Sequence, residues 1–275
     1  MTAAVGIDVG GTKIAAALVD LERGAVLRAR RTPTAPQRGP RAVLEDCVAL
    51  AREVAAGEQV AAVGLAVCEL VDPGGRVRSA ETVDWRAVDV AAALSGLGPA
   101  RVESDVRAAA TAEARYGAGR TEPDFLYVSV GTGISHCLIV DGRPRTGVRG
   151  SALGTGAPLV ERWAGGLALA RRTGHRDAEA ALEDPAAAAT VADAARRLGL
   201  VLAALVNGLD PGAVVFGGGL GMRTDYRERV VAAMREEIYD PDARELPALP
   251  AALGVDAGVI GAALAASLPP APPRA

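Results

Sequence analysis

Short apolar runs alternate along the chain with longer segments in which apolar residues recur at helical spacing. The runs have the length of buried strands, and the longer segments have the period of amphipathic helices. Strands are predicted at residues 3–9, 14–19, 25–31, 60–67, 101–103, 125–130, 134–140 and 213–216. Helices are predicted at residues 41–56, 105–116, 186–207, 224–238 and from 256 onwards. This mixed order indicates an α/β protein.

Two pairs of predicted strands are joined by turns made of glycine and threonine. The turns are Gly10-Gly11-Thr12-Lys13 and Gly131-Thr132-Gly133. Glycine permits a tight reversal, and missing side chains let backbone N–H groups approach phosphate oxygens. The first turn alone fits an ordinary hairpin equally well, and neither turn is a Walker A loop. Together the two turns predict a protein that holds a polyphosphate between two loops.

Asp8 is a single acid at the end of the first apolar strand. A buried carboxylate without a partner is costly. Hydrated Mg²⁺ is a suitable partner, because this ion prefers oxygen ligands and keeps several waters. The alternative is a capped aspartate in a plain hairpin.

The composition limits the classes of function. Half of the 275 residues are hydrophobic but only 3% are aromatic, so the core must be built from Ala, Val and Leu. A net charge of −3 gives no basic field for nucleic acid. The chain has three cysteines without a C-x-x-C pair, and two histidines. This set favours neither a disulfide framework nor a structural zinc site. We expect a cytoplasmic protein without a signal peptide or membrane span, ending in a disordered tail at 268–275.

With these elements in order, the chain resembles the ROK family of sugar kinases and regulators. The resemblance extends from Gly6 to about Ala266, and its elements are specific only in combination. They are Asp8 to Lys13, Ser104-Asp105 before an Ala-rich helix, Gly131-Thr132-Gly133, Asp210-Pro211 before Val214 to Gly219, and Ala257 to Ala263.

The resemblance implies a two-lobed actin/hexokinase-like (ribonuclease H-like) ATPase fold. The small lobe would comprise residues 1–104 with the C-terminal helix at about 257–267, and the large lobe residues 105–256. ATP and Mg²⁺ are the implied cofactors. Both glycine turns, including Lys13, would contact the phosphates, Asp8 would hold Mg²⁺ through water, and Gly217-Gly218-Gly219 would line the adenosine. The alternative for these three glycines is a tight strand–helix turn.

Asp105 is the implied catalytic base. A sugar hydroxyl is a poor nucleophile until a carboxylate orients it and accepts its proton. Asp105 lies between a predicted strand end and a helix start. Its alternative role there is helix N-capping.

The sugar pocket departs from the family pattern. Ser104 stands where the family has Asn, and Thr155 ends the segment that aligns with Glu-x-Gly-His. The cysteine cluster that binds zinc in the family is missing, so we expect no zinc and a replacement brace around Trp163. Glu161 matches a Glu that contacts sugar in the family, and a position on a solvated helix face is its alternative. Glu81 or Thr82 takes the place of a family Asn. His136 is expected to be structural.

These departures make ordinary glucose in its usual pose a poor substrate, because each lost hydrogen bond costs about 1–3 kcal/mol. An aminodeoxy-hexose such as kanosamine, from an antibiotic pathway, or a cyclitol would suit the acids Glu69, Glu81 and Glu161. The alternatives are a catalytically silent nucleotide- or sugar-binding protein and a sugar-responsive regulator. Because the first strand is predicted to begin near the start of the given sequence, we expect no N-terminal DNA-binding domain and no nucleic-acid partner. A homodimer is expected from family analogy alone.

Overall fold

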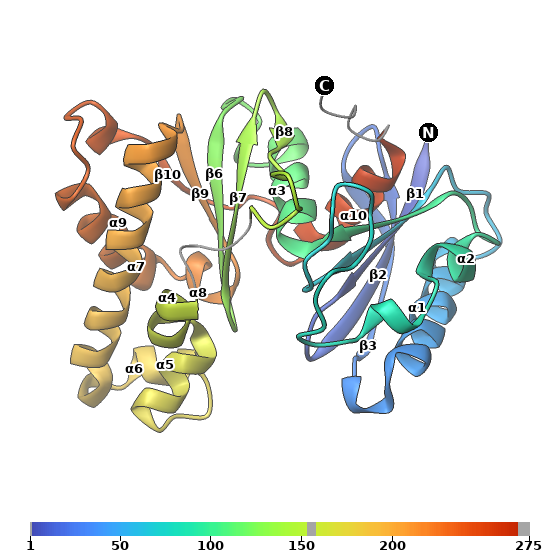
Figure 1. Cartoon of the computed structure of the whole chain (residues 1–275), viewed down its shortest axis with the longest axis horizontal. Coiled ribbons are helices and arrows are strands. Elements are labelled where there is room, and N and C mark those ends of the chain that lie inside the picture. Colours follow the sequence, from blue (N-terminus) through green and yellow to red (C-terminus); the bar gives the residue numbers. More distant parts are fainter. Residues whose placement is uncertain (1, 153–157, 269–275) are drawn as a thin grey trace. The chain divides into compact units, whose positions relative to one another are not determined.

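The computed structural model of the chain describes residues 2–152 and 158–268. The chain divides into two compact units (Figure 1). The first unit comprises Met1–Gly117, Pro144–Ala152 and Val255–Ala275, and the second comprises Ala118–Arg143 and Leu153–Gly254. The α/β class expected from the sequence is confirmed in each unit.

The first unit contains a five-stranded mixed sheet in the order β3-β2-β1-β4-β5. Its strands are β1 (Ala3–Val9), β2 (Lys13–Asp20), β3 (Ala25–Pro33), β4 (Val63–Val67) and β5 (Ala100–Ser104). β1 to β3 form an antiparallel meander, whereas β4 and β5 continue from β1 in parallel. The carboxyl ends of β1, β4 and β5 therefore share one edge of the sheet.

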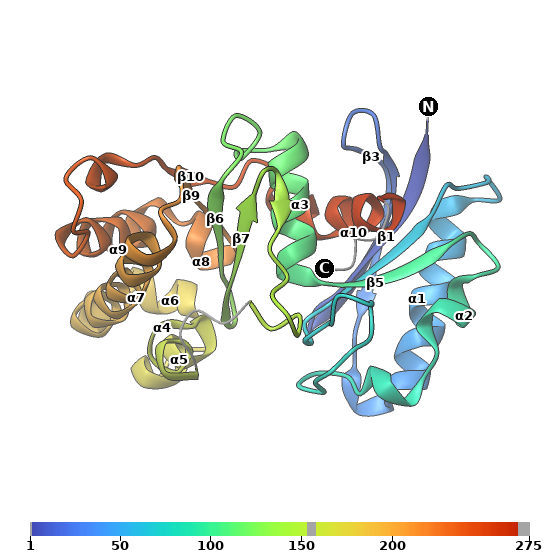
Figure 2. The ribbon, with the colours of Figure 1, turned by 45° about the horizontal axis from the view of Figure 1, so that its top comes forward.

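Helices cover both faces of this sheet (Figure 2). They are α1 (Pro40–Ala55), α2 (Val90–Leu94), α3 (Asp105–Tyr116) and α10 (Ala257–Ser267). Alternate β1 residues such as Val5 and Ile7 join the core beneath α1. On the opposite face, Gly6 and Gly64 have no side chains, so the backbone of α10 packs directly on β1 and β4.

The second unit has a sheet in the order β10-β9-β6-β7-β8. Its strands are β6 (Phe125–Val130), β7 (Ile134–Val140), β8 (Arg143–Pro144), β9 (Ala213–Gly217) and β10 (Ala248–Pro250). β6 and β7 form an antiparallel hairpin, and β9 lies parallel to β6. Listed from β8 to β10, this order repeats that of the first sheet from β3 to β5, as the two similar hairpins predicted.

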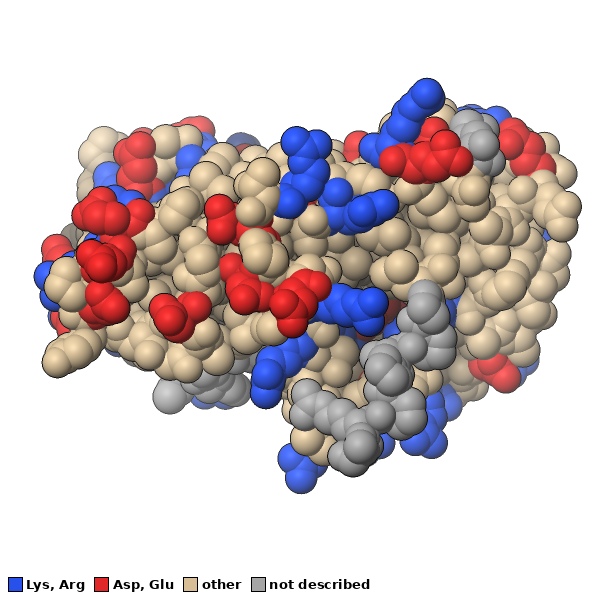
Figure 3. All heavy atoms as spheres, turned by 90° about the horizontal axis from the view of Figure 1, so that it is seen from above, with Lys and Arg blue, Asp and Glu red and all other residues tan. Residues whose placement is uncertain are grey.

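The helices of the second unit are α4 (Pro158–Ala164), α5 (Gly166–Thr173), α6 (Ala178–Glu183), α7 (Ala188–Leu209), α8 (Gly219–Met222) and α9 (Thr224–Glu236). One apolar core joins β6 and β9 to α7 and α9, with Leu126, Leu198 and Phe216 among its members. No helix in the described part of the chain combines the length and apolar character of a membrane span. Acidic and basic side chains both occur on the face in Figure 3, separated by broad uncharged areas.

The unit boundary differs from the expected division at residues 104 and 105. Helix α3 belongs to the first unit, because it packs closely against α10. Gly261 makes this packing possible, since a Cβ atom there would overlap the backbone of Ala108. The expected pairing of the C-terminal helix with the N-terminal strands agrees with this unit. The expected tail at 268–275 lies, except for Leu268, outside the described residues.

Candidate active site

Three parallel strands of the first unit end in residues that carry chemistry. Val9 of β1 is in register with Val67 of β4, and Val67 with Ser104 of β5. Asp8, Cys68 and Asp105 therefore gather at one edge of the sheet, at or just beyond the strand ends. Crevices at the carboxyl ends of parallel strands are common ligand sites.

Asp105 is the first residue of α3 and is half-buried. Its Oδ1 accepts a hydrogen bond of 2.6 Å from the N–H of Val106, so it also contributes to the start of the helix. Burial, followed by the negative charge of Asp8, raises the pKa of Asp105 to about 7. A carboxyl with this pKa can both accept and release a proton near neutral pH. The predicted base thus has suitable acidity, whereas its alternative role as the N-cap is not found, because Ser104 is the N-cap residue and no side chain caps the helix.

Asp8 is half-buried, and burial raises its pKa to about 6 although Lys13 acts in the opposite direction. Its carboxylate makes no hydrogen bond to any other described residue. Gly258 at the start of α10 leaves space for it, since a Cβ atom there would overlap Oδ2 of Asp8. A half-buried carboxylate without a hydrogen-bond partner among the described residues fits a Mg²⁺ ion that keeps most of its waters.

The turn between β1 and β2 is held by hydrogen bonds to its backbone carbonyl oxygens. The N–H of Gly10 donates to Lys13 O at 3.0 Å, and Thr34 donates to Gly10 O and Thr12 O at 2.6 and 3.1 Å. The N–H groups of Gly11 and Thr12 have no acceptor among the described residues. Cβ atoms on Gly10 and Gly11 would meet no atom closer than 3.5 Å. Packing therefore does not demand these glycines, and the space beside them can receive a ligand.

The second turn, in the second unit, repeats this arrangement. The N–H of Gly131 donates to Gly133 O at 2.9 Å, and the first N–H groups of α5 donate to the carbonyls of Gly131 and Thr132 at 2.8 and 3.1 Å. The N–H groups of Thr132 and Gly133 find no acceptor in the described chain. A Cβ atom on Gly131 would meet nothing within 4 Å. Both turns therefore present two adjacent N–H donors, which suits phosphate oxygens.

The three glycines after β9 have different reasons to be glycine. Gly217 and Gly218 are required by packing, because Cβ atoms would overlap the Tyr127 hydroxyl and lie 2.5 Å from Val130 O. Gly218 also has a φ of +76°, which favours glycine. Gly219 opens α8 and faces open space. The alternative of a tight strand–helix turn thus accounts for Gly217 and Gly218, while a role beside adenosine stays a prediction for all three.

Glu69 holds a loop and is not available to a substrate. Its Oε1 accepts from the N–H groups of Thr82 and Val83 at 2.9 and 2.8 Å, and its Oε2 accepts from Trp85 Nε1 at 3.0 Å. The side chain is 1% exposed. The expectation that Glu69 faces a cationic substrate was therefore wrong, because its oxygens were already committed to residues 82–85.

The other expected substrate residues have diverse environments. Glu81 is exposed beside this loop, and Ser104 is buried with its Oγ 3.5 Å from Oδ1 of Asp105. Glu161, on α4, is exposed, and its Oε2 accepts from Ile134 N at 2.9 Å. It therefore supports the Gly131-Thr132-Gly133 turn from the side. Thr155 lies outside the described residues, and His136 is buried, as expected of a structural histidine.

A cation–π cluster fixes helix α4. The guanidinium groups of Arg172 and Arg197 both lie over the Trp163 ring, at 4.6 and 4.1 Å from its centroid. Arg172 also donates to Trp163 O at 2.8 Å, and Asp193 accepts from both arginines at 2.9 Å. Among residues 2–152 and 158–268, no three His, Cys, Asp or Glu side chains are placed to share a metal ion. The brace expected around Trp163 is present, and the absence of zinc stays a prediction.

Comparison with known proteins gives consistent matches. The sequence matches the ROK family over residues 4–161 and 156–267. It is 28% identical to a glucokinase of Streptomyces coelicolor, with 94% of this chain and 96% of that protein covered. It is 29% identical to an N-acetylmannosamine kinase of Yersinia pseudotuberculosis, with 94% and 96% covered. A crystal structure of a ROK family glucokinase from Streptomyces griseus, in complex with glucose and AMPPNP, superposes with a TM-score of 0.82 at 28% identity, covering 96% of this chain and 99% of that one.

Proposed function

The chain belongs to the ROK family, and from this membership and the site geometry we propose that it is an ATP-dependent sugar kinase. The transferred group is the terminal phosphoryl of ATP, and the acceptor is a hydroxyl on a hexose-like alcohol. The relatives named glucokinase and N-acetylmannosamine kinase support both parts of this proposal.

The observation that carries the proposal is the position of Asp105, a half-buried carboxyl at the sheet edge where the parallel strand ends also bring Asp8. Burial raises the pKa of Asp105 to about 7, which suits this role. In the reaction, Asp105 orients the acceptor hydroxyl and takes its proton while the oxygen bonds to the γ-phosphorus and ADP leaves. Phosphoryl transfer needs little more from the protein than positioning and charge stabilisation. Each turn, considered within its own unit, presents a pair of N–H donors that suits phosphate oxygens. Mg²⁺, held by Asp8 through water, would offset the negative charge of the phosphates.

For the acceptor, we propose a hexose with an altered substituent, including an aminodeoxy-hexose. Ser104 stands where the family pattern has Asn, the Glu161 carboxylate accepts from Ile134 N beside the second turn, and Glu69 is committed to its loop. Of the acids first considered for an amino group, Glu81 and Glu161 are exposed. Kanosamine is one member of this class.

The test measures ADP formation with a panel of hexoses, amino sugars, N-acetylated amino sugars and cyclitols. We expect turnover with at least one hexose-like alcohol and none with Asp105→Asn, whose affinity for ATP should remain near that of the wild type. ATP binding without turnover on any acceptor would overturn the kinase proposal in favour of a silent binding protein. Equal activity in Asp105→Asn would remove this carboxylate from the mechanism.

A further inference from the structure

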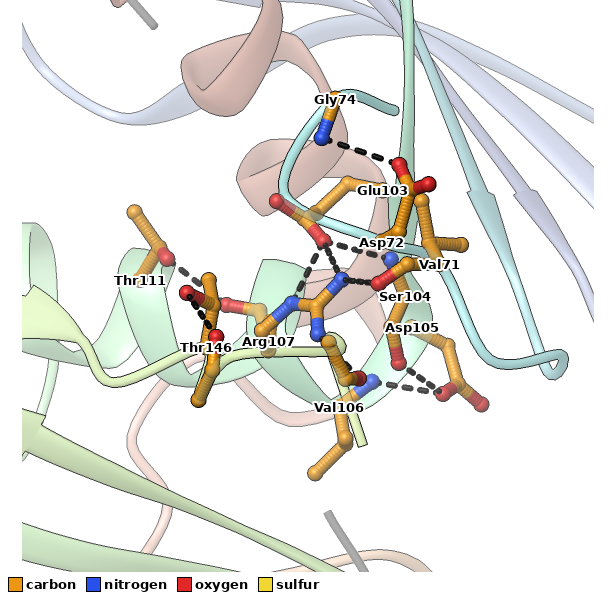
Figure 4. Close-up of polar contacts among 12 residues, drawn as sticks. Val71, Asp72, Gly74, Glu103, Ser104, Asp105, Val106, Arg107, Thr111 and Thr146 are labelled. Atoms are coloured by element: carbon orange, nitrogen blue, oxygen red, sulfur yellow. Dashed lines mark hydrogen bonds and ion pairs between the residues drawn. The ribbon is translucent and has the colours of Figure 1, made fainter. Parts of the chain in front are cut away.

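Arg107 is among the most deeply buried large side chains of the first unit, at 1% exposed. It lies two residues after Asp105 on helix α3 (Figure 4). A buried arginine is costly unless all of its donors find acceptors. Its partners therefore indicate what the residue is for.

The first partner lies across the junction of β5 and α3. Glu103 Oε1 accepts from Arg107 Nε at 2.6 Å and also from the N–H of Ser104 at 2.8 Å. The ion pair joins the residue two before Asp105 to the residue two after it. It thereby fixes the backbone on both sides of the proposed base.

The other partners are backbone carbonyls of two separate segments. Arg107 Nη2 donates to Val71 O at 2.7 Å (Figure 4). Nη1 donates to Gly150 O at 2.9 Å. Gly150 has a φ of +73°, and a Cβ atom on it would overlap the backbone of Val71. Segment 144–152 is therefore packed directly on loop 70–78, and the guanidinium joins both to α3.

Loop 70–78 is itself held in one conformation. Val71 and Val77 form an isolated antiparallel bridge. The side chain of Asp72 accepts from the N–H groups of Gly74 and Arg76, each at 2.9 Å. A movement of Arg107 would therefore displace a rigid loop as a whole.

From these contacts we propose that Arg107 is a positioning residue for the phosphoryl acceptor. It fixes loop 70–78 and segment 144–152 relative to Asp105, so that the acceptor hydroxyl meets the carboxylate in one orientation. The kinetic consequence of this inference rests on the proposed kinase function. The contacts of Arg107 with the two segments can be tested without turnover.

The principal variant is Arg107→Lys, which keeps the charge but lacks the planar fork that holds these three acceptors in their present geometry. Arg28→Lys is the matched control, because Arg28 also joins a carboxylate, Glu58, to two backbone carbonyls, those of Val54 and Ala55. We expect kcat/KM for the acceptor to fall about 10- to 100-fold in Arg107→Lys, since small displacements of reacting groups have effects of this size. The KM for ATP should stay within about twofold, since a lysine keeps the charge and the first turn is held by Thr34. Neither value should change in Arg28→Lys.

Hydrogen exchange on the full-length protein gives the readout that does not need turnover. Amides of 70–78 and 144–152 should exchange faster in Arg107→Lys, while those of β1 and β2 should be unchanged. If the wild type phosphorylates no alcohol, the kinase proposal fails. The exchange comparison still shows whether Arg107 holds loop 70–78 and segment 144–152 in place.

Gly150→Ala separates the two segments while leaving Arg107 in place, and should show the same loss of acceptor kcat/KM. If Arg107→Lys does not fold, the double variant Glu103→Gln with Arg107→Met takes its place in both assays. The double variant removes the ion pair without leaving a buried charge unpaired. The proposal is overturned if a folded variant keeps the acceptor kcat/KM and exchange pattern of the wild type. It is also overturned if the acceptor and ATP parameters worsen equally, which would indicate a general structural role.

Discussion

Gly258 of α10 lies so close to the Asp8 carboxylate that a Cβ atom on Gly258 would overlap Oδ2 of Asp8. The C-terminal helix thus sets the position of an acid at the other end of the chain. The same helix packs on α3, which begins with Asp105. One helix therefore fixes the spacing of the two carboxylates in the proposed site.

We predict that Gly258→Ala displaces Asp8 and lowers kcat about tenfold or more, with a higher Mg²⁺ concentration for half-maximal rate. Gly208→Ala on α7 is the control, because a Cβ atom there meets nothing within 4 Å. The control should keep both the activity and the stability of the wild type. Steady-state kinetics with varied Mg²⁺ checks the prediction. An unchanged Mg²⁺ dependence in folded Gly258→Ala would show that Asp8 does not serve the metal.

The rate should depend on pH through Asp105. Its pKa is raised to about 7, so the fraction of ionised base falls as the pH drops below that value. We expect kcat/KM for the acceptor to decrease about tenfold for each pH unit well below 7. Asp8, with a pKa of about 6, would steepen the decline further. A pH–rate profile that stays flat between about pH 5 and 8 would contradict the assignment of the base.

The same shift predicts that Asp105 destabilises the folded protein at neutral pH. A carboxyl whose pKa is higher in the folded than in the unfolded state binds more protons when folded, so stability falls as pH rises from about 4 to 7. Asp105→Asn removes this penalty and should raise the free energy of unfolding at pH 8 by roughly 1–3 kcal/mol. This value is smaller than the full pKa shift implies, because the side chain is partly exposed. The gain should shrink toward about pH 4. Urea unfolding at several pH values measures it, and equal stability of both proteins at pH 8 would contradict the shift.

Much of the fold and part of the site could be predicted from local sequence patterns. Apolar runs located the central strands, and the two glycine–threonine turns revealed the repeated hairpin. Asp8 and Asp105 stand where apolar strands end, so the edge they share follows from parallel pairing alone.

The rest depended on contacts between residues far apart in the sequence. Nothing near Glu69 shows that its oxygens bind residues 82–85, and so its acidity alone suggested a substrate contact. Arg107 interrupts an Ala-rich helix, but its partners at Val71 and Gly150 are 36 and 43 residues away. Gly258 occurs in a run of small residues, and only the fold distinguishes it from its neighbours.

Glu161 offers a test between support of the second turn and contact with a substrate. Glu161→Ala removes the acceptor for the N–H of Ile134, whereas Glu161→Gln can still accept with its amide oxygen. If Glu161 supports the turn, the alanine variant should raise the KM for ATP about five- to tenfold, and the glutamine variant should not. ATP kinetics of the two variants measures this. A glutamine variant that keeps its ATP KM but loses preference for an amino sugar would indicate contact with the substrate.

The cation–π cluster around Trp163 should contribute to stability and to nucleotide use. Two guanidinium groups lie against the ring, and each such contact contributes about 0.5–1 kcal/mol at a partly exposed site. We expect Trp163→Leu to lower the free energy of unfolding by about 1–2 kcal/mol and to raise the KM for ATP, because α4 carries Glu161. Leu167→Ala, at an exposed leucine of α5, is the control. A variant as stable as the wild type would show that the cluster does not brace the helix.

Zinc should be dispensable if this cluster fixes α4. The cluster connects α4 to α5 and α7 without a metal ligand, through Trp163, Arg172, Arg197 and Asp193. Treatment with a zinc chelator, followed by return of Mg²⁺, should leave the midpoint of thermal unfolding and the turnover rate unchanged. Metal analysis of the purified protein should find far less than one zinc per chain. A midpoint that falls on chelation in the wild type, and falls further in Trp163→Leu, would mean that a metal and the aromatic cluster share the task.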